Sequence, residues 1–283
     1  MIMDTGRCRC IMVQGTSSNS GKSTIVTALC RILVDEGYRV APFKAQNMSS
    51  RLYRTEDGSI ALAQAVQAYA SRVKPSVYMN PILLKPLGDY MSSVILLGRE
   101  YGVIHAEEYY KHFVLKKGLR VVLDAYKRLA EEYDIIVIEG AGSPAEINIS
   151  RYDIANMRLA ERIDAPVLIV SDIERGGCFA SMIGTLRLLK SHERELVKGF
   201  IINKFRGDTR ILHRAVERFE SISRKMVLGI VPYITGLNIP EEDSLGVDTI
   251  DNSITDESID RVAYIVKRSI DMEKVRGLII NNR

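Results

Sequence analysis

Residues 15–24 have the sequence Gly-Thr-Ser-Ser-Asn-Ser-Gly-Lys-Ser-Thr, and this stretch decides the fold. The apolar run at 10–14 predicts a short buried strand, and residues 25–35 carry apolar side chains at helical spacing. A glycine-bounded loop between a strand and a helix is typical of a phosphate-binding loop, in which backbone N–H groups and the helix dipole face a polyphosphate. The sequence therefore predicts a nucleoside triphosphate site.

The residue types in this loop predict separate roles. Lys22 is expected to reach the β- and γ-phosphates, and the Ser23 hydroxyl is expected to bind Mg²⁺. Five residues separate Gly15 from Gly21, where the common pattern has four. A Gly/Ser-rich turn before an ordinary helix is the structural alternative. The predicted ATP-binding residues of this stretch are Gly15, Thr16, Asn19, Ser20, Gly21, Lys22, Ser23 and Thr24.

The composition is that of an ordinary globular α/β enzyme domain, with 283 residues, 46% hydrophobic and 26% charged. The formal net charge of +4 is small and dispersed, and no basic tract indicates nucleic-acid binding. The four cysteines are too scattered for a disulfide framework, and Cys8-Arg-Cys10 lacks the spacing of a zinc site. No segment has the form of a signal peptide or the ~20 apolar residues of a membrane span. We therefore expect a cytoplasmic protein.

Strands and helices alternate along the chain. Continuous apolar runs predict buried strands at 38–43, 134–138, 166–170, 199–202 and 227–231, with a shorter one at 94–97. Amphipathic stretches predict helices at 59–71, 107–132 (interrupted near Gly118), 180–189, 208–219 and 261–274. This alternation predicts an α/β fold with a mostly parallel sheet flanked by helices. Ligands bind such sheets beyond the carboxyl ends of the strands.

A second polar motif, Ile-Glu-Gly-Ala-Gly-Ser at 138–143, closes the strongest apolar run. Glu139 ends a predicted strand beside the phosphate loop, so it is positioned to hold Mg²⁺ directly or through water. The glycines behind it let backbone approach a ligand closely. The alternative is a β-turn with an exposed glutamate.

A further polar pair lies where a helix is predicted to begin. Asp153 and Asn156 are spaced i and i+3, so Asp153 is either an N-cap or a site residue, and the spacing alone favours the cap. Arg175 precedes two glycines in the loop at 171–177. This loop suits an anion, although a flexible turn explains the glycines equally well.

Other candidates follow strands directly. The amide of Asn203 suits an adenine edge, and Arg206 suits a phosphate or a carboxylate. Lys44 ends the second strand and directs another cation at the same crevice.

Together these motifs resemble the synthetase domain of the cobyric acid synthase family, glutamine-dependent enzymes that amidate corrin-ring carboxylates. The five-residue spacing of the phosphate loop and the Glu-Gly-Ala-Gly element also resemble dethiobiotin synthetase. The resemblance implies a P-loop NTPase fold of that type, with residues 1–245 as the synthetase domain and 246–283 as a surface arm and C-terminal helix. The segments that carry it are 14–16, 43–48, 63–68, 79–86, 139–148, 153–157, 172–177, 199–208, 231–233 and 240–244.

The resemblance implies a reaction of cobalamin biosynthesis, the conversion of cobyrinic acid a,c-diamide to cobyric acid. A corrinoid carboxylate attacks the γ-phosphate of ATP to form an acyl phosphate, and ammonia then displaces phosphate to leave an amide. Lys22, Lys44 and Mg²⁺ would neutralise charge, while Asp153 would act on the incoming ammonium. The substrate contacts that it implies are Gln46, Asn47, Lys85, Ser143, Asn156 and Arg175.

Two features depart from the family pattern. Family members usually continue into a glutaminase domain, whereas this sequence stops at Arg283, so we expect free ammonia or a separate glutaminase subunit as the nitrogen source. Ser59 stands where the family usually has Glu, and Glu56 or Asp57 are the candidates to replace a lost metal ligand.

Cys178, at the start of a predicted helix, is the candidate reactive thiol, but no histidine lies near it in sequence, which favours a structural role.

Two other functions stay open. One keeps the fold and changes the substrate, as in a dethiobiotin synthetase-like or other carboxylate-activating ligase. The other is a partition-type ATPase switch, a class that normally carries a lysine early in its phosphate loop, where position 17 here is Ser. The assembly to test is a homodimer that binds a corrinoid small molecule, with no nucleic-acid or membrane partner.

Overall fold

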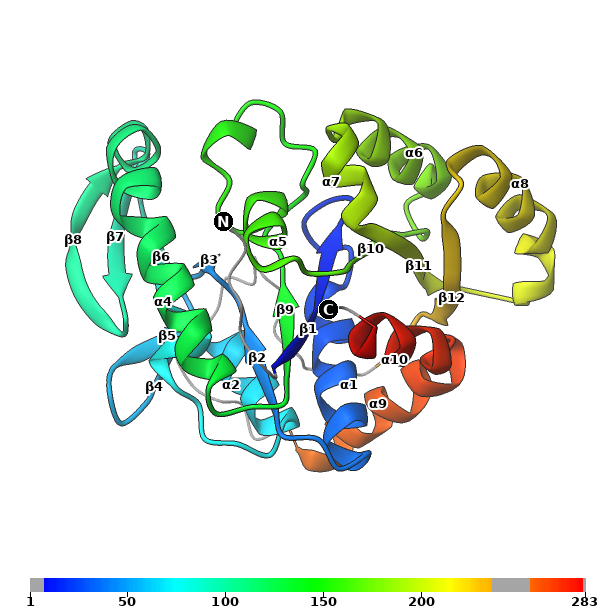
Figure 1. Cartoon of the computed structure of the whole chain (residues 1–283), viewed down its shortest axis with the longest axis horizontal. Helices are drawn as coiled ribbons and strands as arrows, with labels where there is room; N and C mark the ends of the chain where they lie inside the picture. Colours follow the sequence, from blue (N-terminus) through cyan, green and yellow to red (C-terminus); the bar gives the residue numbers. More distant parts are fainter. Residues whose placement is uncertain (1–7, 236–254, 282–283) are drawn as a thin grey trace.

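The computed structural model describes residues 8–235 and 255–281. At its centre lies a six-stranded sheet in which every neighbouring pair is parallel, in the order β12-β11-β10-β1-β9-β2 (Figure 1). Each strand overlaps one of the predicted apolar runs, which confirms the predicted fold class. The strands are β1 (Arg9–Gly15), β2 (Val40–Phe43), β9 (Ile135–Glu139), β10 (Val167–Asp172), β11 (Val197–Phe205) and β12 (Met226–Pro232).

Helices cover both faces of this sheet, because successive residues of a strand point to opposite sides. On β1, Ile11 and Val13 join one hydrophobic layer, whereas Cys10 and Met12 join the other. Helices of the first layer are α1 (Lys22–Asp35), α2 (Leu62–Ala70), α9 (Asp256–Ser269) and α10 (Met272–Ile280). Helices of the second are α4 (Leu119–Ala130), α5 (Met157–Ile163), α6 (Cys178–Leu188) and α8 (His213–Ser223).

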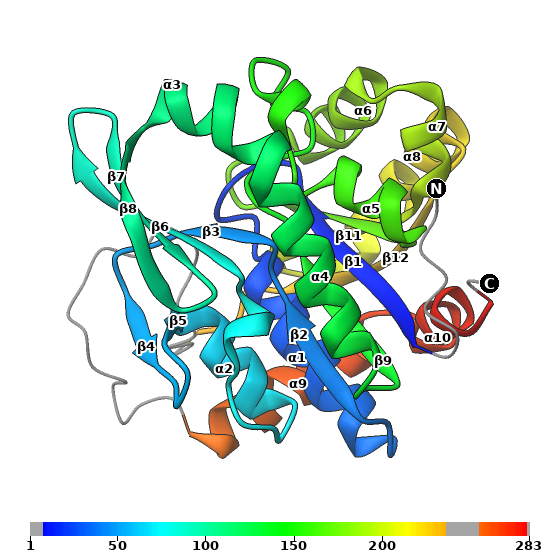
Figure 2. The ribbon, with the colours of Figure 1, turned by 60° about the vertical axis from the view of Figure 1, so that its left-hand side comes forward.

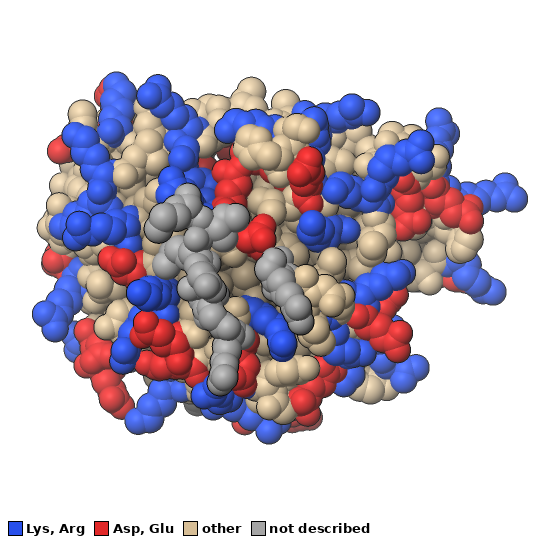
Figure 3. All heavy atoms as spheres, viewed as in Figure 1, with Lys and Arg blue, Asp and Glu red and all other residues tan. Residues whose placement is uncertain are grey.

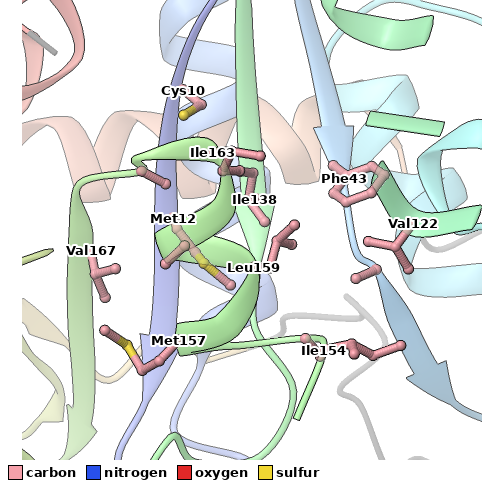
Figure 4. Close-up of a cluster of buried hydrophobic side chains, with 14 of the residues drawn as sticks. Cys10, Met12, Phe43, Val122, Ile138, Ile154, Met157, Leu159, Ile163 and Val167 are labelled. Atoms are coloured by element: carbon pink, nitrogen blue, oxygen red, sulfur yellow. The ribbon is translucent and has the colours of Figure 1, made fainter. Parts of the chain in front are cut away.

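The second layer is drawn in Figure 4. Met157, Leu159 and Ile163 of α5 point toward the sheet, where Met12 and Ile138 are fully buried. Burial on both faces explains why these strands are continuously apolar rather than alternating.

A second sheet follows β2 in the chain, in the order β3-β6-β7-β8. β3 and β6 are parallel, and the other pairs are antiparallel. Figure 2 shows β7 and β8 projecting to one side of the central sheet. The sequence predicted only a short strand at 94–97, because β8 is mostly exposed and lacks a clear apolar face. The strands are β3 (Gln46–Met48), β6 (Ile82–Gly88), β7 (Met91–Leu96) and β8 (Arg99–His105).

Two predicted helices differ from the structure. The helix predicted at 59–71 starts later, because β5 (Ser59–Ala61) pairs with β4 (Leu52–Arg54) before α2 begins. The stretch at 107–132 runs from α3 (Ala106–Glu108) through a π-helical segment (Tyr109–Gly118) into α4, so the helix type changes where an interruption was predicted. The remaining short elements are α7 (Ser191–Leu196) and the 3₁₀ turns Val77–Met79, Ser150–Tyr152 and Thr209–Leu212.

The single helix predicted at 261–274 is two helices in the structure. Between them, Ile270 pairs with Gly229 of β12, and the Asp271 N–H donates to Leu228 O at 2.8 Å. Both helices pack into the hydrophobic layer that contains α1. The first part of the segment predicted as a surface arm and C-terminal helix, at 246–254, lies outside the described residues.

The surface mixes both signs of charge. On the face shown in Figure 3, Lys and Arg lie among Asp and Glu, in agreement with the small formal net charge of +4. Within residues 8–235 and 255–281, no helix has the length and apolar character needed to cross a membrane.

Candidate active site

The loop between β1 and α1 is shaped by its two glycines. Gly21 has a φ of +96° directly before α1, and a Cβ there would lie 2.0 Å from Asn203 Nδ2. A Cβ on Gly15 would lie 2.3 Å from Ser20 Oγ. Side chains at these positions would displace their neighbours. The predicted strand, glycine-bounded loop and helix are therefore confirmed.

Lys22 joins this loop to the second motif. Its Nζ donates to Ser17 O and to Gly142 O, each at 3.1 Å, and the residue is 2% exposed. The lysine therefore lies between the phosphate loop and the Glu-Gly-Ala-Gly loop after β9. Phosphate oxygens are stronger acceptors for an ammonium group than these carbonyls are.

Glu139 is the centre of a buried polar cluster at the end of β9. Its Oε1 accepts from Ser23 Oγ and from Lys44 Nζ, each at 2.9 Å. Its Oε2 accepts from the side-chain amide of Gln67. Glu139 and Lys44 are both 0% exposed, so this glutamate does not lie in an exposed turn.

The donor set fits a magnesium ion. A carboxylate and a hydroxyl oxygen are the hard ligands that Mg²⁺ takes, usually together with water and phosphate oxygens. Ser23 and Glu139 would supply these two protein ligands. Gln67 carries a side-chain carbonyl, Oε1, that is buried without a hydrogen-bond partner among the described residues.

Gln67 is not among the predicted site residues, because it lies within helix α2 and not after a strand. The available signal was the pair Gln64 and Gln67, spaced i and i+3 in an otherwise apolar, alanine-rich helix. That spacing places both amides on one face of the helix.

Two consecutive residues at the end of β11 donate side-chain hydrogen bonds to backbone carbonyls of the phosphate loop. Asn203 Nδ2 donates to Ser20 O at 3.0 Å, and Lys204 Nζ donates to Asn19 O at 2.7 Å. Lys204 has a φ of +62° and also lies 3.5 Å from an Asp172 carboxylate oxygen. Asn203 is 4% exposed, so in this structure its amide braces the loop.

Arg206 lies near this brace but faces a different group. Its guanidinium donates to Glu174 Oε1 at 2.8 Å and lies 3.5 Å from the centre of the Tyr233 ring. The structure therefore pairs Arg206 with a carboxylate and an aromatic face.

The loop after β9 is held by two side chains that precede α5. Asn156 exchanges two hydrogen bonds with the Ala141 backbone, at 2.7 and 3.1 Å. Asp153 Oδ1 accepts from the Ala155 and Asn156 N–H groups, each at 2.9 Å. Burial raises the pKa of the Asp153 carboxyl above its ordinary value, against the effect of these backbone donors. The N-cap of α5 is Asn156, so Asp153 closes the turn before the helix.

A pocket of about 200 Å³ opens beside the phosphate loop. It brings together Ser18 with four of the predicted site residues, Gln46, Ser143, Asp153 and Asn156. Its less polar lining includes Met48, Tyr110, Ile149, Tyr152 and Ile154.

Three other predicted substrate residues lie outside the lining of this pocket. Asn47 is buried and donates to Gln64 Oε1 at 2.7 Å. Lys85 is half-buried on β6, and Arg175 is exposed in the loop between β10 and α6. The geometry therefore separates these residues from the group that lines the pocket.

Two sequence features have local explanations. Ser59 pairs with Arg54 in the β4–β5 hairpin, and Glu56 forms an exposed ion pair with Lys74 at 3.1 Å. Burial raises the pKa of the Cys178 thiol to about 11, which agrees with the structural role that the sequence favours.

The parallel sheet, the glycine-bounded loop and the buried Ser23–Glu139 contact define a P-loop nucleotide-binding domain. Residues 11–246 match the family described as the CobQ/CobB/MinD/ParA nucleotide binding domain, and the chain belongs to this family. The predicted family resemblance is thereby confirmed.

Curated relatives are similar over most of this chain. It is 51% identical over 251 residues to the cobyric acid synthase of Dehalococcoides mccartyi strain CBDB1, covering 88% of this chain and 50% of that protein. It is 53% identical over 238 residues to a probable cobyric acid synthase of Methanocaldococcus jannaschii, covering 83% and 47%. The chain thus spans about half the length of these relatives. Among solved structures, the signal recognition particle receptor FtsY from Elizabethkingia anophelis is 16% identical with a TM-score of 0.48, covering 91% of this chain and 66% of that one.

Proposed function

We propose that this domain uses ATP and Mg²⁺ to amidate a carboxylate of a corrinoid, as in the conversion of cobyrinic acid a,c-diamide to cobyric acid. The observation that carries the proposal is the position of the pocket. Its lining includes Ser18 of the phosphate loop and Gly142 of the loop that follows Glu139, and Gly142 O accepts from Lys22 Nζ. Identity of about half to cobyric acid synthases supports the choice of substrate class.

The proposed chemistry has two steps. A carboxylate oxygen of the substrate attacks the γ-phosphorus of ATP, the bond to the β–γ bridging oxygen breaks, and ADP leaves. Ammonia then attacks the acyl carbon of the acyl phosphate, inorganic phosphate leaves with the bonding electrons, and one proton of the ammonia nitrogen is lost. Phosphorylation is needed because a free carboxylate has no adequate leaving group.

The residues contribute chiefly position and charge. Lys22 and Lys44 would neutralise the phosphate charge that moves during transfer. Mg²⁺, held by Ser23 and Glu139, would supply Lewis-acid stabilisation of the same charge. Asp153 faces the pocket with a raised pKa, which makes its carboxylate a better base for the proton that ammonium loses.

We propose that ammonia reaches the site as free ammonium or from a separate glutaminase. A glutaminase needs a reactive thiolate, usually beside a histidine. Burial raises the pKa of Cys10 and Cys178 to about 11 and that of Cys8 and Cys30 to about 12. These thiols stay protonated at neutral pH, so the four cysteines are poor nucleophiles.

The test is an assay with purified protein, MgATP, ammonium and cobyrinic acid a,c-diamide. We expect ADP release that depends on the corrinoid, together with an amide product detected by mass spectrometry. Glutamine in place of ammonium should give no product. ATP hydrolysis at the same rate with and without the corrinoid would contradict the proposal and favour an ATPase switch.

A further inference from the structure

Two glutamines on α2 are equally buried but have different partners. Gln64 and Gln67 are both 0% exposed. Gln64 Oε1 accepts from Asn47 Nδ2 at 2.7 Å, whereas Gln67 Nε2 donates to Glu139 Oε2. The helix therefore directs one amide toward β3 and the other toward the carboxylate at the end of β9.

The three donors around Glu139 divide between its two oxygens. Ser23 and Lys44 both contact Oε1, and Gln67 contacts Oε2. The last torsion of a glutamate is broad, so a donor on one oxygen alone fixes the carboxylate plane poorly. The hydrogen bond from Gln67 to Oε2 therefore fixes the plane of the Glu139 carboxylate, with Oε1 facing Ser23.

The orientation of the Gln67 amide follows from its partner. An ionised carboxylate only accepts hydrogen bonds, so the NH₂ group of the amide must face Glu139 and the carbonyl must face away from it. That carbonyl, Oε1, is buried and has no partner among residues 8–235 and 255–281. Buried carbonyl oxygens are usually satisfied, and water in the coordination shell of a cation is a suitable donor.

We propose that Gln67 is a positioning residue for Mg²⁺: its amide holds the Glu139 carboxylate so that Oε1 is presented to the metal beside Ser23. This inference rests on the magnesium site of the proposed function. Partners of metal ligands typically alter metal affinity by about 10- to 100-fold when they are removed. Gln67 acts through Glu139, so its loss should weaken metal binding more than nucleotide binding.

The experiment compares Gln67→Met with Gln64→Met. Each variant removes one buried amide from the same helix and keeps a side chain of similar length. Calorimetric titration of a non-hydrolysable ATP analogue at a series of Mg²⁺ concentrations gives the Mg²⁺ dependence of binding. We expect Gln67→Met to need about 10- to 100-fold more Mg²⁺, whereas Gln64→Met should match the wild type. Without Mg²⁺, all three proteins should bind the analogue equally.

Two outcomes would overturn the inference and one would overturn its basis. Equal Mg²⁺ dependence in Gln67→Met and the wild type would remove the positioning role, and equal weakening in both variants would indicate a purely structural role. If the wild type binds the ATP analogue with the same affinity at every Mg²⁺ concentration, the proposed magnesium site is contradicted. If Gln67→Met does not fold, Gln67→Asn retains an amide but is one methylene shorter, and the same weakening is expected.

Discussion

The Glu139–Lys44 ion pair is a buried pair with both side chains removed from solvent. Bringing two charges out of water is costly, and the pair is stable only while each charge faces the other. Ser23 and Gln67 each donate a further hydrogen bond to the carboxylate. The same contacts therefore serve stability and the proposed catalysis, and variants must separate the two effects.

A double-mutant cycle on this pair makes that separation. Glu139→Gln removes the carboxylate that faces the buried Lys44 ammonium, so we expect a loss of about 3–5 kcal/mol in the free energy of unfolding by urea. Lys44→Met should cost a similar amount, and the double variant should cost less than the sum. Additive losses would show that the two side chains do not interact. ATP turnover should be lost in all three.

Lys22 precedes Ser23 in the phosphate loop, and its Nζ donates to two backbone carbonyls. Lys22→Ala should lower corrinoid-dependent ATP turnover by at least about 100-fold, because the lysine neutralises transferred phosphate charge. The free energy of unfolding should change by only about 1–2 kcal/mol, since two neutral acceptors lose a donor. Lys204→Ala is the control: it loosens the loop at Asn19, so KM for ATP should rise more than kcat falls. Near-normal turnover in Lys22→Ala would contradict the assignment of the phosphate loop.

The rate at which Cys178 is alkylated should depend on pH. Its pKa is raised to about 11 by burial, so the thiol is neutral at low pH and becomes thiolate only as pH approaches 11. Iodoacetamide should therefore label it slowly at pH 7.5, and the rate should climb with pH throughout the range in which the fold persists. Rapid labelling at pH 7 would show a depressed pKa and reopen a nucleophilic role. Cys178→Ser should retain ammonium-dependent turnover.

Among the elements, α1 and α9 are joined by a buried arginine. Arg31 on α1 is 2% exposed, and it contacts Asp256 at 2.5 Å and Asp260 at 3.4 Å, both on α9. The two carboxylates are largely exposed, with 81% and 56% of their side-chain surface accessible. Loss of a partner therefore leaves either aspartate in water, whereas it leaves the Arg31 guanidinium buried.

This asymmetry predicts an order of stabilities. Arg31→Met should cost about 1–2 kcal/mol, because the two aspartates are left in water. Asp256→Asn combined with Asp260→Asn should cost about 3–5 kcal/mol, because Arg31 is left as a buried charge without a carboxylate. Urea unfolding measures both, and hydrogen exchange should show earlier opening of α9. The reverse order would contradict the assigned burial.

The parallel sheet and its loops could be predicted because their signals are local. β9 is five consecutive buried residues, and a glycine-bounded loop follows β1. β8 was missed because its apolar residues do not follow its burial: Tyr101 and Val103 are exposed, whereas Gly102 and Ile104 are half-buried. Gln67 was missed for a different reason: its role arises only when the fold brings its side chain to Glu139, and the spacing of the glutamines does not identify that partner. The break between α9 and α10 likewise depends on β12, since Asp271 donates to Leu228.

At the scale of the whole molecule, the two hydrophobic layers share one sheet. Adjacent residues of β1 and β9 belong to opposite layers, so neither layer can lose its packing without disturbing the other. We therefore expect one cooperative unfolding transition within the described residues, rather than separate melting of the two layers.

Ligand binding should shift that transition as a unit. At 100 times its Kd, MgATP should add about 2.7 kcal/mol to the free energy of unfolding. Circular dichroism and the fluorescence of the 13 tyrosines, in a chain without tryptophan, should agree with each other on the midpoint without nucleotide and again on the higher midpoint with it. Probes that diverge on adding MgATP would show that only one layer responds to the site.

The packing of α9 against α1 also has a consequence for biosynthesis. The ribosome makes α1 early, but the part of its apolar surface that packs on α9 is covered only when Ile259, Val262 and Val266 have been translated. At about 5–20 residues per second, the nascent chain exposes this surface for many seconds. A chaperone bound near the N-terminal part would shield it during that interval. Translation pauses placed before codon 256 should therefore lower the yield of native protein more than pauses placed after codon 281.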